Sequence, residues 1–259
     1  MAEYAKAPCA EKEEEKSIKS IERAIEIIYF LSEGERGLVE IANHFQLSKA
    51  TAHRLLSSLK ATGLVSQNNV TKRYMVGHGI YRLLNNLFSS NNSALITLSR
   101  NSMYRLKEIS GETISIHIPY GGSRLCVSEI KSDKEIIYTA GIGAIAPIYL
   151  GAAGKALLAF MPENKRKQLL KKFTNVPNLN QELLTKQLEQ IAENRYALSF
   201  GERIYGSACL AVPILIKEEA IAALCILGPS FRLTKADLER MIPHIQHEAN
   251  LIEQALRAD

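Results

Sequence analysis

The 259-residue sequence predicts an α+β protein in which a small, mostly helical domain precedes a larger domain built on an antiparallel sheet. The first eighty residues contain three helix-like segments followed by the pattern of a β-hairpin. From about Ala94 onward, helix-like segments are mixed with β-prone runs, several of which are joined by short turns. Strands connected in this way favour an antiparallel sheet with helices packed on it.

The first domain begins with helices. Residues 1–16, a Glu- and Lys-rich segment without periodicity, are expected to form a disordered tail. The apolar residues of "SIKSIERAIEIIYFLSEG" (17–34) recur at helical spacing, and "GLVEIANHFQ" (37–46) predicts a second, shorter helix. Ser48 is a good N-cap for a third helix in "LSKATAHRLLSSLKATGLV", and Gly63 is a good C-terminal stop for it.

A hairpin completes this domain. Two β-prone runs, Leu64–Gln67 and Lys72–Val76, flank a polar turn at Asn68–Asn69. Three helices followed by such a hairpin predict a winged helix-turn-helix domain over residues 17–77. The hairpin would be its wing.

A helix over residues 78–93, ending in a Ser- and Asn-rich linker, leads into the second domain, residues 94–259. In this domain "GIGAIAPIYLGAAG" predicts a glycine-rich loop. Helices are expected at 94–111, 155–162, 164–173, 181–194 and 234–258. Strands are expected at 113–120, 124–131, 135–140, 208–217 and 220–228.

The third helix has two distinct faces. Leu55, Leu56 and Leu59 lie within about 60° of Ala52 around the helix axis, which predicts a buried side. The opposite side is small, hydroxylated and basic, and such side chains can approach DNA closely and donate to phosphates and base edges. With the helix N-terminus and the wing, the candidate DNA-binding residues are Ser48, Lys49, Ala50, Thr51, His53, Arg54, Ser57, Lys72 and Arg73. A solvated polar face is the alternative.

The distribution of charge favours DNA. The chain carries a net charge of +5, and no Asp or Glu occurs among the sixty-seven residues from Ile41 through Lys107. A region of one sign attracts polyanions. Double-stranded DNA is therefore the expected partner of the first domain.

Several other classes of protein are not favoured. The sequence contains no apolar run of transmembrane length and no signal peptide at its start, so a cytoplasmic protein is expected. Its four cysteines form no C-x-x-C pair and have no His at zinc-ligand spacing, so no metal is expected. "LGAAGKALLAF" is not a phosphate-binding loop, because its glycines are too close and Ala156 replaces the required Ser or Thr. No cofactor and no catalytic residues are therefore predicted.

Five stretches together are specific: "LSKATAHRLLSSLKATGLV", "KRYMVG", "GAIAPIYLGAAGKALLAF", "YALSFGERIYGSACLAVPI" and "GPSFRLT". From about Ile18 to its C-terminus, the chain resembles an IclR-type bacterial transcription regulator. The resemblance implies a DNA-binding N-terminal domain, a linker helix used in dimerisation and an effector domain similar to GAF and PAS folds. It also implies homodimers, or tetramers as paired dimers, on palindromic operators.

The glycine-rich loop runs into a helix N-terminus, where backbone N–H groups near Ala152 and Ala153 favour a carboxylate guest. The resemblance implies an effector pocket for a small organic acid, formed by Tyr138, Ala152, Ala153, Ser199, Cys209, Cys225 and Leu227. Family members known for short 2-oxo acids have a carboxylate in place of Ser199 and serines in place of Cys225 and Leu227. A fairly apolar or aromatic carboxylate is therefore expected, although simple strand packing is the alternative for Cys225 and Leu227.

Two further residues near this loop have simpler interpretations. Lys155 is interpreted as structural or solvated. His117 alternates with Ile116 and Ile118, which favours a histidine satisfied within the sheet over a pocket or metal ligand.

Two other functions stay open at this point. The first is an enzyme acting on a small acid with a fused DNA-binding module, although no set of nucleophile, base and orienting residue is visible in the sequence. The second is a structural DNA-binding protein with an empty C-terminal domain, which the loop-to-helix pocket argues against.

Overall fold

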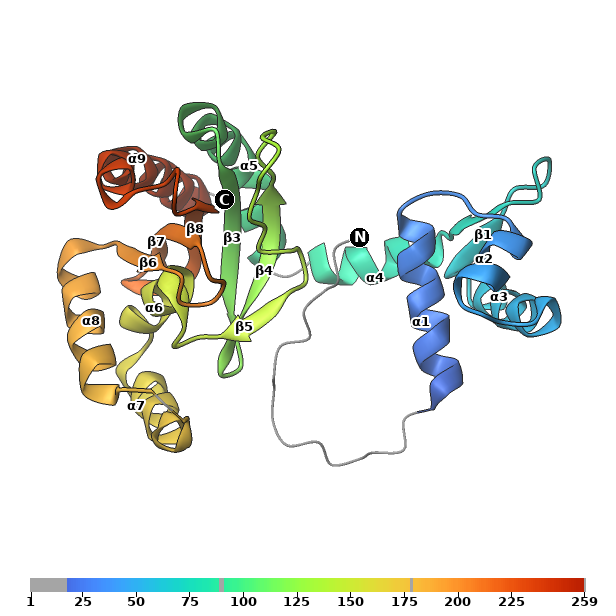
Figure 1. The fold of residues 1–259 in the computed structure, drawn as a ribbon, viewed down its shortest axis with the longest axis horizontal. Coiled ribbons are helices and arrows are strands. Elements are labelled where there is room, and N and C mark those ends of the chain that lie inside the picture. The colour runs from blue at the N-terminus through green and yellow to red at the C-terminus, as the bar shows by residue number, and fades with distance from the viewer. Residues whose placement is uncertain (1–17, 89–90, 178, 259) are drawn as a thin grey trace. The chain divides into compact units, whose positions relative to one another are not determined.

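The computed structural model describes residues 18–88, 91–177 and 179–258. Contacts separate these residues into an N-terminal unit that ends at Ser93 and a C-terminal unit that begins at Ala94 (Figure 1). Each unit has a hydrophobic core of its own. The predicted tail, and Ser89 and Ser90 of the predicted linker, lie outside the described residues.

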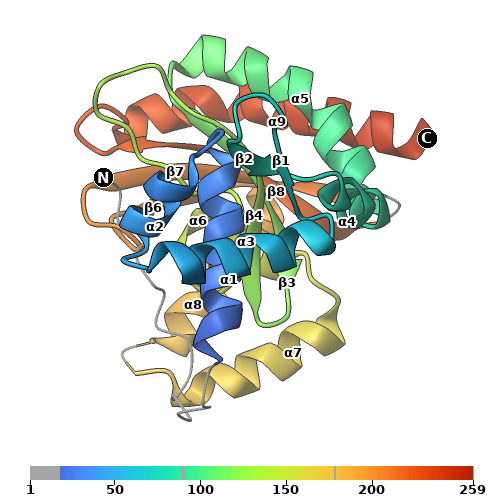
Figure 2. The ribbon, with the colours of Figure 1, turned by 90° about the vertical axis from the view of Figure 1, so that its right-hand side faces the viewer.

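The N-terminal unit consists of three helices, a hairpin and a fourth helix, as the sequence predicts. Its elements are α1 (Lys19–Ser32), α2 (Leu38–His44), α3 (Lys49–Ala61), β1 (Val65–Gln67), β2 (Tyr74–Val76) and α4 (Gly79–Phe88). In Figure 2, α3 runs across α1, with the β1–β2 hairpin beside them. Ile27, Ile41 and Leu56, one from each of the first three helices, are fully buried at the centre of this unit.

The ends of α3 follow from its sequence. The Ser48 side chain accepts a hydrogen bond from the backbone N–H of Thr51 at 3.1 Å, which confirms the predicted N-cap. After Ala61 the chain reverses at Gly63, whose φ of +76° favours glycine. The N–H of Leu64 then bonds the carbonyl of Leu59 at 3.0 Å, as in a Schellman motif.

The C-terminal unit contains a six-stranded antiparallel sheet in the order β5-β4-β3-β8-β7-β6. The strands are β3 (Thr113–Tyr120), β4 (Ser123–Ile130), β5 (Ile145–Pro147), β6 (Ala197–Phe200), β7 (Ser207–Ile216) and β8 (Glu219–Pro229). The helices are α5 (Asn91–Ser110), α6 (Gly151–Ala159), α7 (Glu163–Lys172), α8 (Gln181–Asn194) and α9 (Lys235–Ala258), and a short 3₁₀ turn, η1, follows α7 at Phe173–Asn175.

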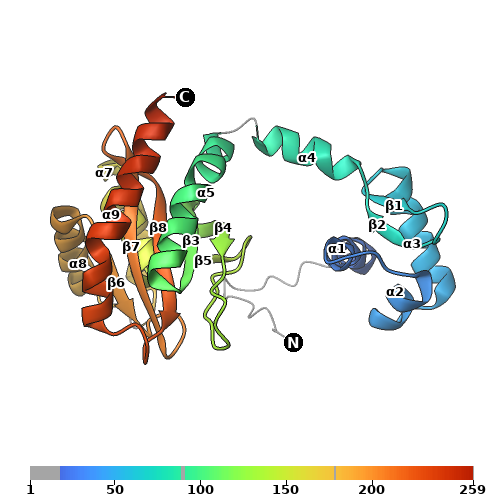
Figure 3. The same ribbon diagram turned by 90° about the horizontal axis from the view of Figure 1, so that it is seen from above.

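Helices cover both faces of this sheet. In Figure 3, α5 and α9 lie on one face and α8 lies on the other, where α6 packs between α8 and the strands β7 and β8. Ile114, Ile116 and Ile118 of β3 pack toward α5 and α9. Because successive side chains of a strand point to opposite faces, Ser115 and His117 point toward α6. The second face therefore has polar groups beneath a helix.

Three parts of the C-terminal unit differ from the sequence-based expectation. The strand predicted at 135–140 is wrong, because this segment is a loop. The backbone N–H groups of Ala140, at its end, and of the next residue, Gly141, donate to the Glu129 carboxylate. The predicted glycine-rich loop instead contains β5, which pairs with β4, and ends where α6 begins at Gly151. The short strand β6 is not predicted.

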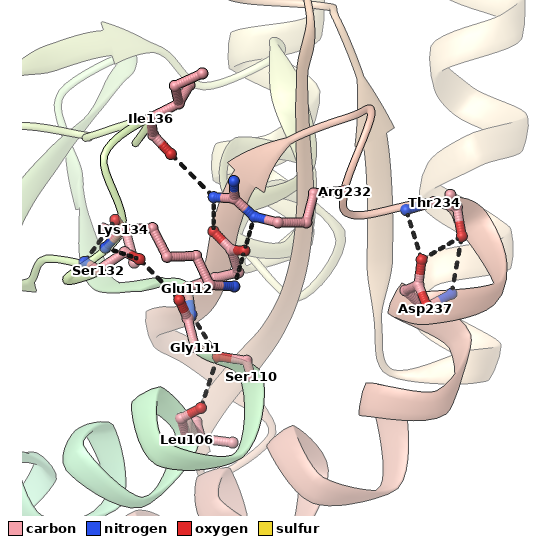
Figure 4. Close-up of polar contacts among 11 residues, drawn as sticks. Leu106, Ser110, Gly111, Glu112, Ser132, Lys134, Ile136, Arg232, Thr234 and Asp237 are labelled. Carbon is pink, nitrogen blue, oxygen red and sulfur yellow. Dashed lines mark hydrogen bonds and ion pairs between the residues drawn. The ribbon is translucent and has the colours of Figure 1, made fainter.

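A buried carboxylate joins three segments at one end of the sheet. Glu112, at the junction of α5 and β3, accepts hydrogen bonds from Arg232 Nε at 2.5 Å, Arg232 Nη2 at 3.0 Å and Lys134 Nζ at 2.7 Å (Figure 4). Arg232 also donates to the carbonyl of Ile136 at 2.9 Å. Burial alone would raise the pKa of Glu112, but these two cations outweigh burial and hold the pKa below its ordinary value.

We expect Arg232→Met to lower the free energy of unfolding of the C-terminal unit by about 1–3 kcal/mol, because the buried Glu112 would keep Lys134 as its sole cation among the described residues. The measurement is the urea midpoint followed by circular dichroism. The control is Lys235→Met, which removes an exposed pair with Glu239 and should change the free energy by less than about 0.5 kcal/mol. Equal effects of the two variants would contradict a stabilising role for the cluster.

Candidate functional site

The predicted faces of α3 are present in the structure. Ala52 and Leu56 are fully buried, Leu59 is 7% exposed and Leu55 is half-buried. All seven candidate residues at and after the N-terminus of this helix are exposed, namely Ser48, Lys49, Ala50, Thr51, His53, Arg54 and Ser57. The side of α3 that the sequence assigns to DNA is therefore accessible.

The described part of the chain does not neutralise the positive charges on this face. Within the described residues, neither Lys49 nor Arg54 has a carboxylate within 4.0 Å, and the first turn of α3 contains no acid. Ser48 and Thr51 hydroxyls lie 2.9 Å apart and hold each other at the helix N-terminus. Arg54 therefore presents its charge to solvent between small and hydroxylated neighbours.

The two predicted wing residues differ from each other. Lys72 is exposed at the turn before β2 with a φ of +58°. Arg73 instead donates to the Glu40 carboxylate at 3.0 Å and to the Glu35 carbonyl at 2.9 Å. Its guanidinium thus joins the hairpin to the region of α2, so Lys72 is the better placed of the two for a phosphate contact.

In the C-terminal unit a pocket lies between the sheet and the N-terminal end of α6. About 440 Å³ of space that protein atoms do not fill, open solvent included, lies within this hollow. Five of the seven predicted effector residues line it: Ala152, Ala153, Ser199, Cys209 and Leu227. They come from α6 and three neighbouring strands, in which Cys209 is the register partner of both Ser199 and Leu227.

The other two predicted residues do not line this pocket. Cys225 is completely buried within β8, where burial raises the pKa of its thiol well above the ordinary value. Cys225 therefore packs within the sheet, which is the alternative interpretation given for it above. Tyr138 is half-buried and its hydroxyl donates to the carbonyl of Tyr205 at 2.8 Å.

The N-terminus of α6 already has partners from within the chain. The N–H of Gly151 donates to Glu202 Oε2 at 3.0 Å, and the N–H of Ala152 donates to Ser199 Oγ at 3.0 Å. Lys155 donates to Glu202 Oε1 at 2.7 Å, so its structural interpretation is correct. A carboxylate guest at the N–H groups near Ala152 and Ala153 therefore stays a prediction. In this structure the Ala152 N–H donates to Ser199, and the neighbouring Gly151 N–H donates to the chain's own Glu202.

Sequence reasoning missed most of the polar groups of the pocket. Ser115, His117, Arg124 and Arg203 all line it. The alternation of His117 with two isoleucines placed it on the opposite face of β3 from the core, but that pattern alone does not show what covers the face. No pattern in the sequence singles out Arg124, which enters the site because β4 pairs with β3.

His117 connects two of these groups. Its Nδ1 accepts a hydrogen bond from Arg124 Nη1 at 2.9 Å, since an arginine can only donate. Nε2 then carries the ring proton and donates to Ser115 Oγ at 3.1 Å. Burial, together with the charges of Arg124 and Arg203, lowers the pKa of His117 well below the ordinary value. The imidazole is therefore neutral.

A metal site is not evident. In the part of the chain that the structure describes, no three His, Cys, Asp or Glu side chains gather closely enough to hold a metal ion. Likewise, no described helix is long and apolar enough to cross a lipid bilayer.

Neutral His117 predicts a loss of stability in acid. Because its pKa is lower in the folded than in the unfolded chain, the unfolded chain takes up the proton first. The stabilisation is complete above about pH 6.5, the unfolded value, and decreases as the pH falls below it.

We therefore expect His117→Gln, which keeps a donor and an acceptor, to reduce the difference between the thermal unfolding midpoints at about pH 7.5 and about pH 5.5. His53→Gln, at an exposed position of α3, is the control and should leave this difference unchanged. An undiminished difference in the His117 variant would contradict the neutral buried imidazole.

Comparison with known proteins identifies related sequences over most of the chain. A family model described as "IclR helix-turn-helix domain" matches residues 20–69, and one described as "Bacterial transcriptional regulator IclR C-terminal" matches residues 88–254. The HTH-type transcriptional regulator BhcR of Paracoccus denitrificans is 29% identical over 236 residues, covering 88% of this chain and 84% of BhcR. The HTH-type transcriptional repressor AllR of Escherichia coli K12 is 28% identical over 234 residues, covering 87% and 86%.

Solved structures share the fold. An IclR protein of Thermotoga maritima superposes with a TM-score of 0.73 at 24% identity, covering 93% of this chain and 99% of that one. An IclR homologue of Microbacterium hydrocarbonoxydans, complexed with 4-hydroxybenzoate, has a TM-score of 0.68 at 20% identity, covering 93% and 100%. These likenesses confirm the predicted α+β architecture. The sequence relatives are regulators of transcription and not enzymes.

Proposed function

Because the chain belongs to the IclR family of bacterial transcriptional regulators, we propose that it binds a palindromic operator as a dimer or tetramer and releases or recruits that operator in response to a small organic acid. The proposed division is a DNA-binding domain over residues 17–77, a linker and dimerisation helix over 78–93 and an effector domain over 94–259. DNA binding and effector sensing are the family's activities. The oligomer, the operator symmetry and the class of effector are the proposal.

The observation that supports the DNA-binding half is the exposed side of α3. Arg54 stands there without an acidic partner among the described residues, between the small Ala50 and the hydroxyl of Ser57. An α-helix fits the major groove, and arginine is the side chain most often used to read guanine there. Two copies of α3 in a dimer would contact half-sites about one helical turn, or a multiple of it, apart.

The lining of the pocket supports an organic acid as the effector. Arg124 and Arg203 supply positive charge, while Ala152, Ala153 and Leu227 supply apolar surface. A carboxylate joined to a compact apolar or aromatic body matches this combination. The related protein from Microbacterium hydrocarbonoxydans, which was solved with 4-hydroxybenzoate, gives an aromatic acid as a precedent within the same fold.

The coupling between the two sites is thermodynamic. An effector that binds one arrangement of the oligomer more tightly shifts the population toward it, and the operator affinity changes by the same coupling free energy. The enzyme alternative is not carried forward, since the sequence relatives are transcriptional regulators.

We expect Arg54→Ala to weaken binding to the operator by about 5- to 150-fold, since one lost contact to a base edge costs about 1–3 kcal/mol. The measurement is a gel shift or fluorescence anisotropy with the promoter DNA that the protein protects. Arg23→Ala, at an exposed position of α1, is the matched control and should leave affinity nearly unchanged. If both variants bind as the unmodified protein does, α3 does not read the operator.

We expect at least one acid from a panel of glyoxylate, pyruvate, benzoate and 4-hydroxybenzoate to raise the melting temperature and to change operator affinity. Binding to the folded state stabilises it by about 2.7 kcal/mol at one hundred times Kd. The aromatic acids should act at lower concentration than the two short ones. If no acid of the panel binds, the organic-acid proposal fails, and stronger binding of pyruvate would reverse the expected preference.

A further inference from the structure

One buried charge in the C-terminal unit has no opposite charge beside it. Arg124 is 6% exposed, and among the described residues no carboxylate lies within ion-pair distance of its guanidinium. The other four Glu and Lys residues that are buried in the described part of the unit are all paired. The pairs are Glu112 with Arg232 and Lys134, Lys155 with Glu202, Glu248 with Arg105, and Glu253 with Arg257.

The guanidinium of Arg124 also has unused donors. Nη1 donates to His117, but Nε is buried and has no hydrogen-bond partner in the described structure. Nη2 lies toward the start of α6, where a β-carbon added to Gly151 would stand 3.8 Å from it and 3.9 Å from Ser199 Oγ. Nη2 has no hydrogen bond to any described residue. The guanidinium of Arg124 is thus held by His117 on one side and faces the pocket on its other side.

No carboxylate among the described residues compensates this charge. His117 is neutral, and Arg203 lines the same pocket and repels Arg124. An unpaired charge inside a protein costs several kcal/mol, so proteins concentrate such groups at functional sites. An anion that enters the pocket would remove this cost.

We propose that Arg124 is the anion anchor of the pocket and that its guanidinium binds the carboxylate of the effector. This inference rests on the proposed function, in which the effector is an organic acid. The carboxylate then lies on the β3–β4 side of the pocket. The Gly151 N–H at the start of α6 is not its partner, because the Glu202 carboxylate already accepts from that group.

This placement defines the ligand more narrowly. With its charged end at Arg124, the rest of the molecule meets Ala152, Ala153 and Leu227. The site therefore fits a monocarboxylate whose body is apolar, and it should bind the corresponding uncharged amide far less well. His117 is a positioning residue, because its Nδ1 holds Nη1 and so orients the guanidinium.

The test is calorimetric titration with benzoate, 4-hydroxybenzoate and pyruvate, each compared with its amide where one exists. We expect Arg124→Met to raise the Kd of the acid that binds most tightly by at least about 30-fold, as when one partner of a buried charge pair is truncated. Arg203→Met removes the other arginine of the pocket, which is half-buried and, among the described residues, reaches only the Thr139 carbonyl at 3.5 Å, so its loss should weaken the acid less than about 5-fold. The matched control is Arg240→Met, at an exposed position of α9 outside the pocket, which should leave binding of the acid within about 2-fold.

A second measurement uses the unmodified protein and therefore does not depend on the folding of a variant. A carboxylate at Arg124 adds negative charge next to the His117 ring, so saturating acid should shift the ring nitrogen resonances of His117 and raise its pKa. An exposed histidine such as His53 is the internal control.

The outcomes separate the two proposals. If an acid binds and Arg124→Met changes its Kd by less than about 2-fold, the anchor is overturned while the organic-acid effector stands. The same holds if the acid binds but leaves the His117 resonances unchanged. Binding of the amide as tightly as the acid overturns the anchor as well. If none of these acids binds the unmodified protein, the organic-acid effector itself is refuted, and the anchor with it.

Discussion

The central pairing of β3 with β8 is the interaction on which the effector domain depends. It joins the β3–β4–β5 half of the sheet to the β6–β7–β8 half, which come from distant parts of the chain. Its register places Ile116 opposite Leu224 on the face covered by α5 and α9, and Ser115 opposite Cys225 on the face covered by α6. A slip of one residue would exchange the two faces and bury His117 among the isoleucines. The same ladder thus fixes the core and the pocket.

Burial and hydrogen bonding have different consequences at the two ends of this sheet. At Glu112, two cations surround one carboxylate, and the result is a rigid junction among three segments. At Arg124, one cation is held by a neutral histidine, and no carboxylate among the described residues lies within ion-pair distance of it. The first arrangement is complete within the chain. The second becomes complete only when something else brings a negative charge, and this difference distinguishes a structural ion cluster from a binding site.

Local features of the chain were predictable from the sequence. The faces of α3, its N-cap at Ser48 and the strand over Thr113–Tyr120 follow from periodicity and capping, which act within a few residues. The loop at 135–140 was not predictable, since its N–H groups bond the side chain of Glu129 rather than a neighbouring strand. Sequence resemblance, not periodicity, suggested Ser199 and Cys209 as parts of one site. Arg124 and His117 meet there only through tertiary structure.

The carboxylate of Glu202 at the N-terminus of α6 has a consequence for how the pocket of this protein can be redesigned. Gly151, Lys155 and Glu202 form a closed electrostatic unit that needs no ligand to balance it. The charge that a ligand meets is then set by Arg124 on β4 and by Arg203 after β6, neither of which belongs to this unit. Ligand charge and helix anchoring are thereby separated, so substituting residue 124 offers a route to biosensors for uncharged or cationic inducers while the start of α6 keeps its own ion pair.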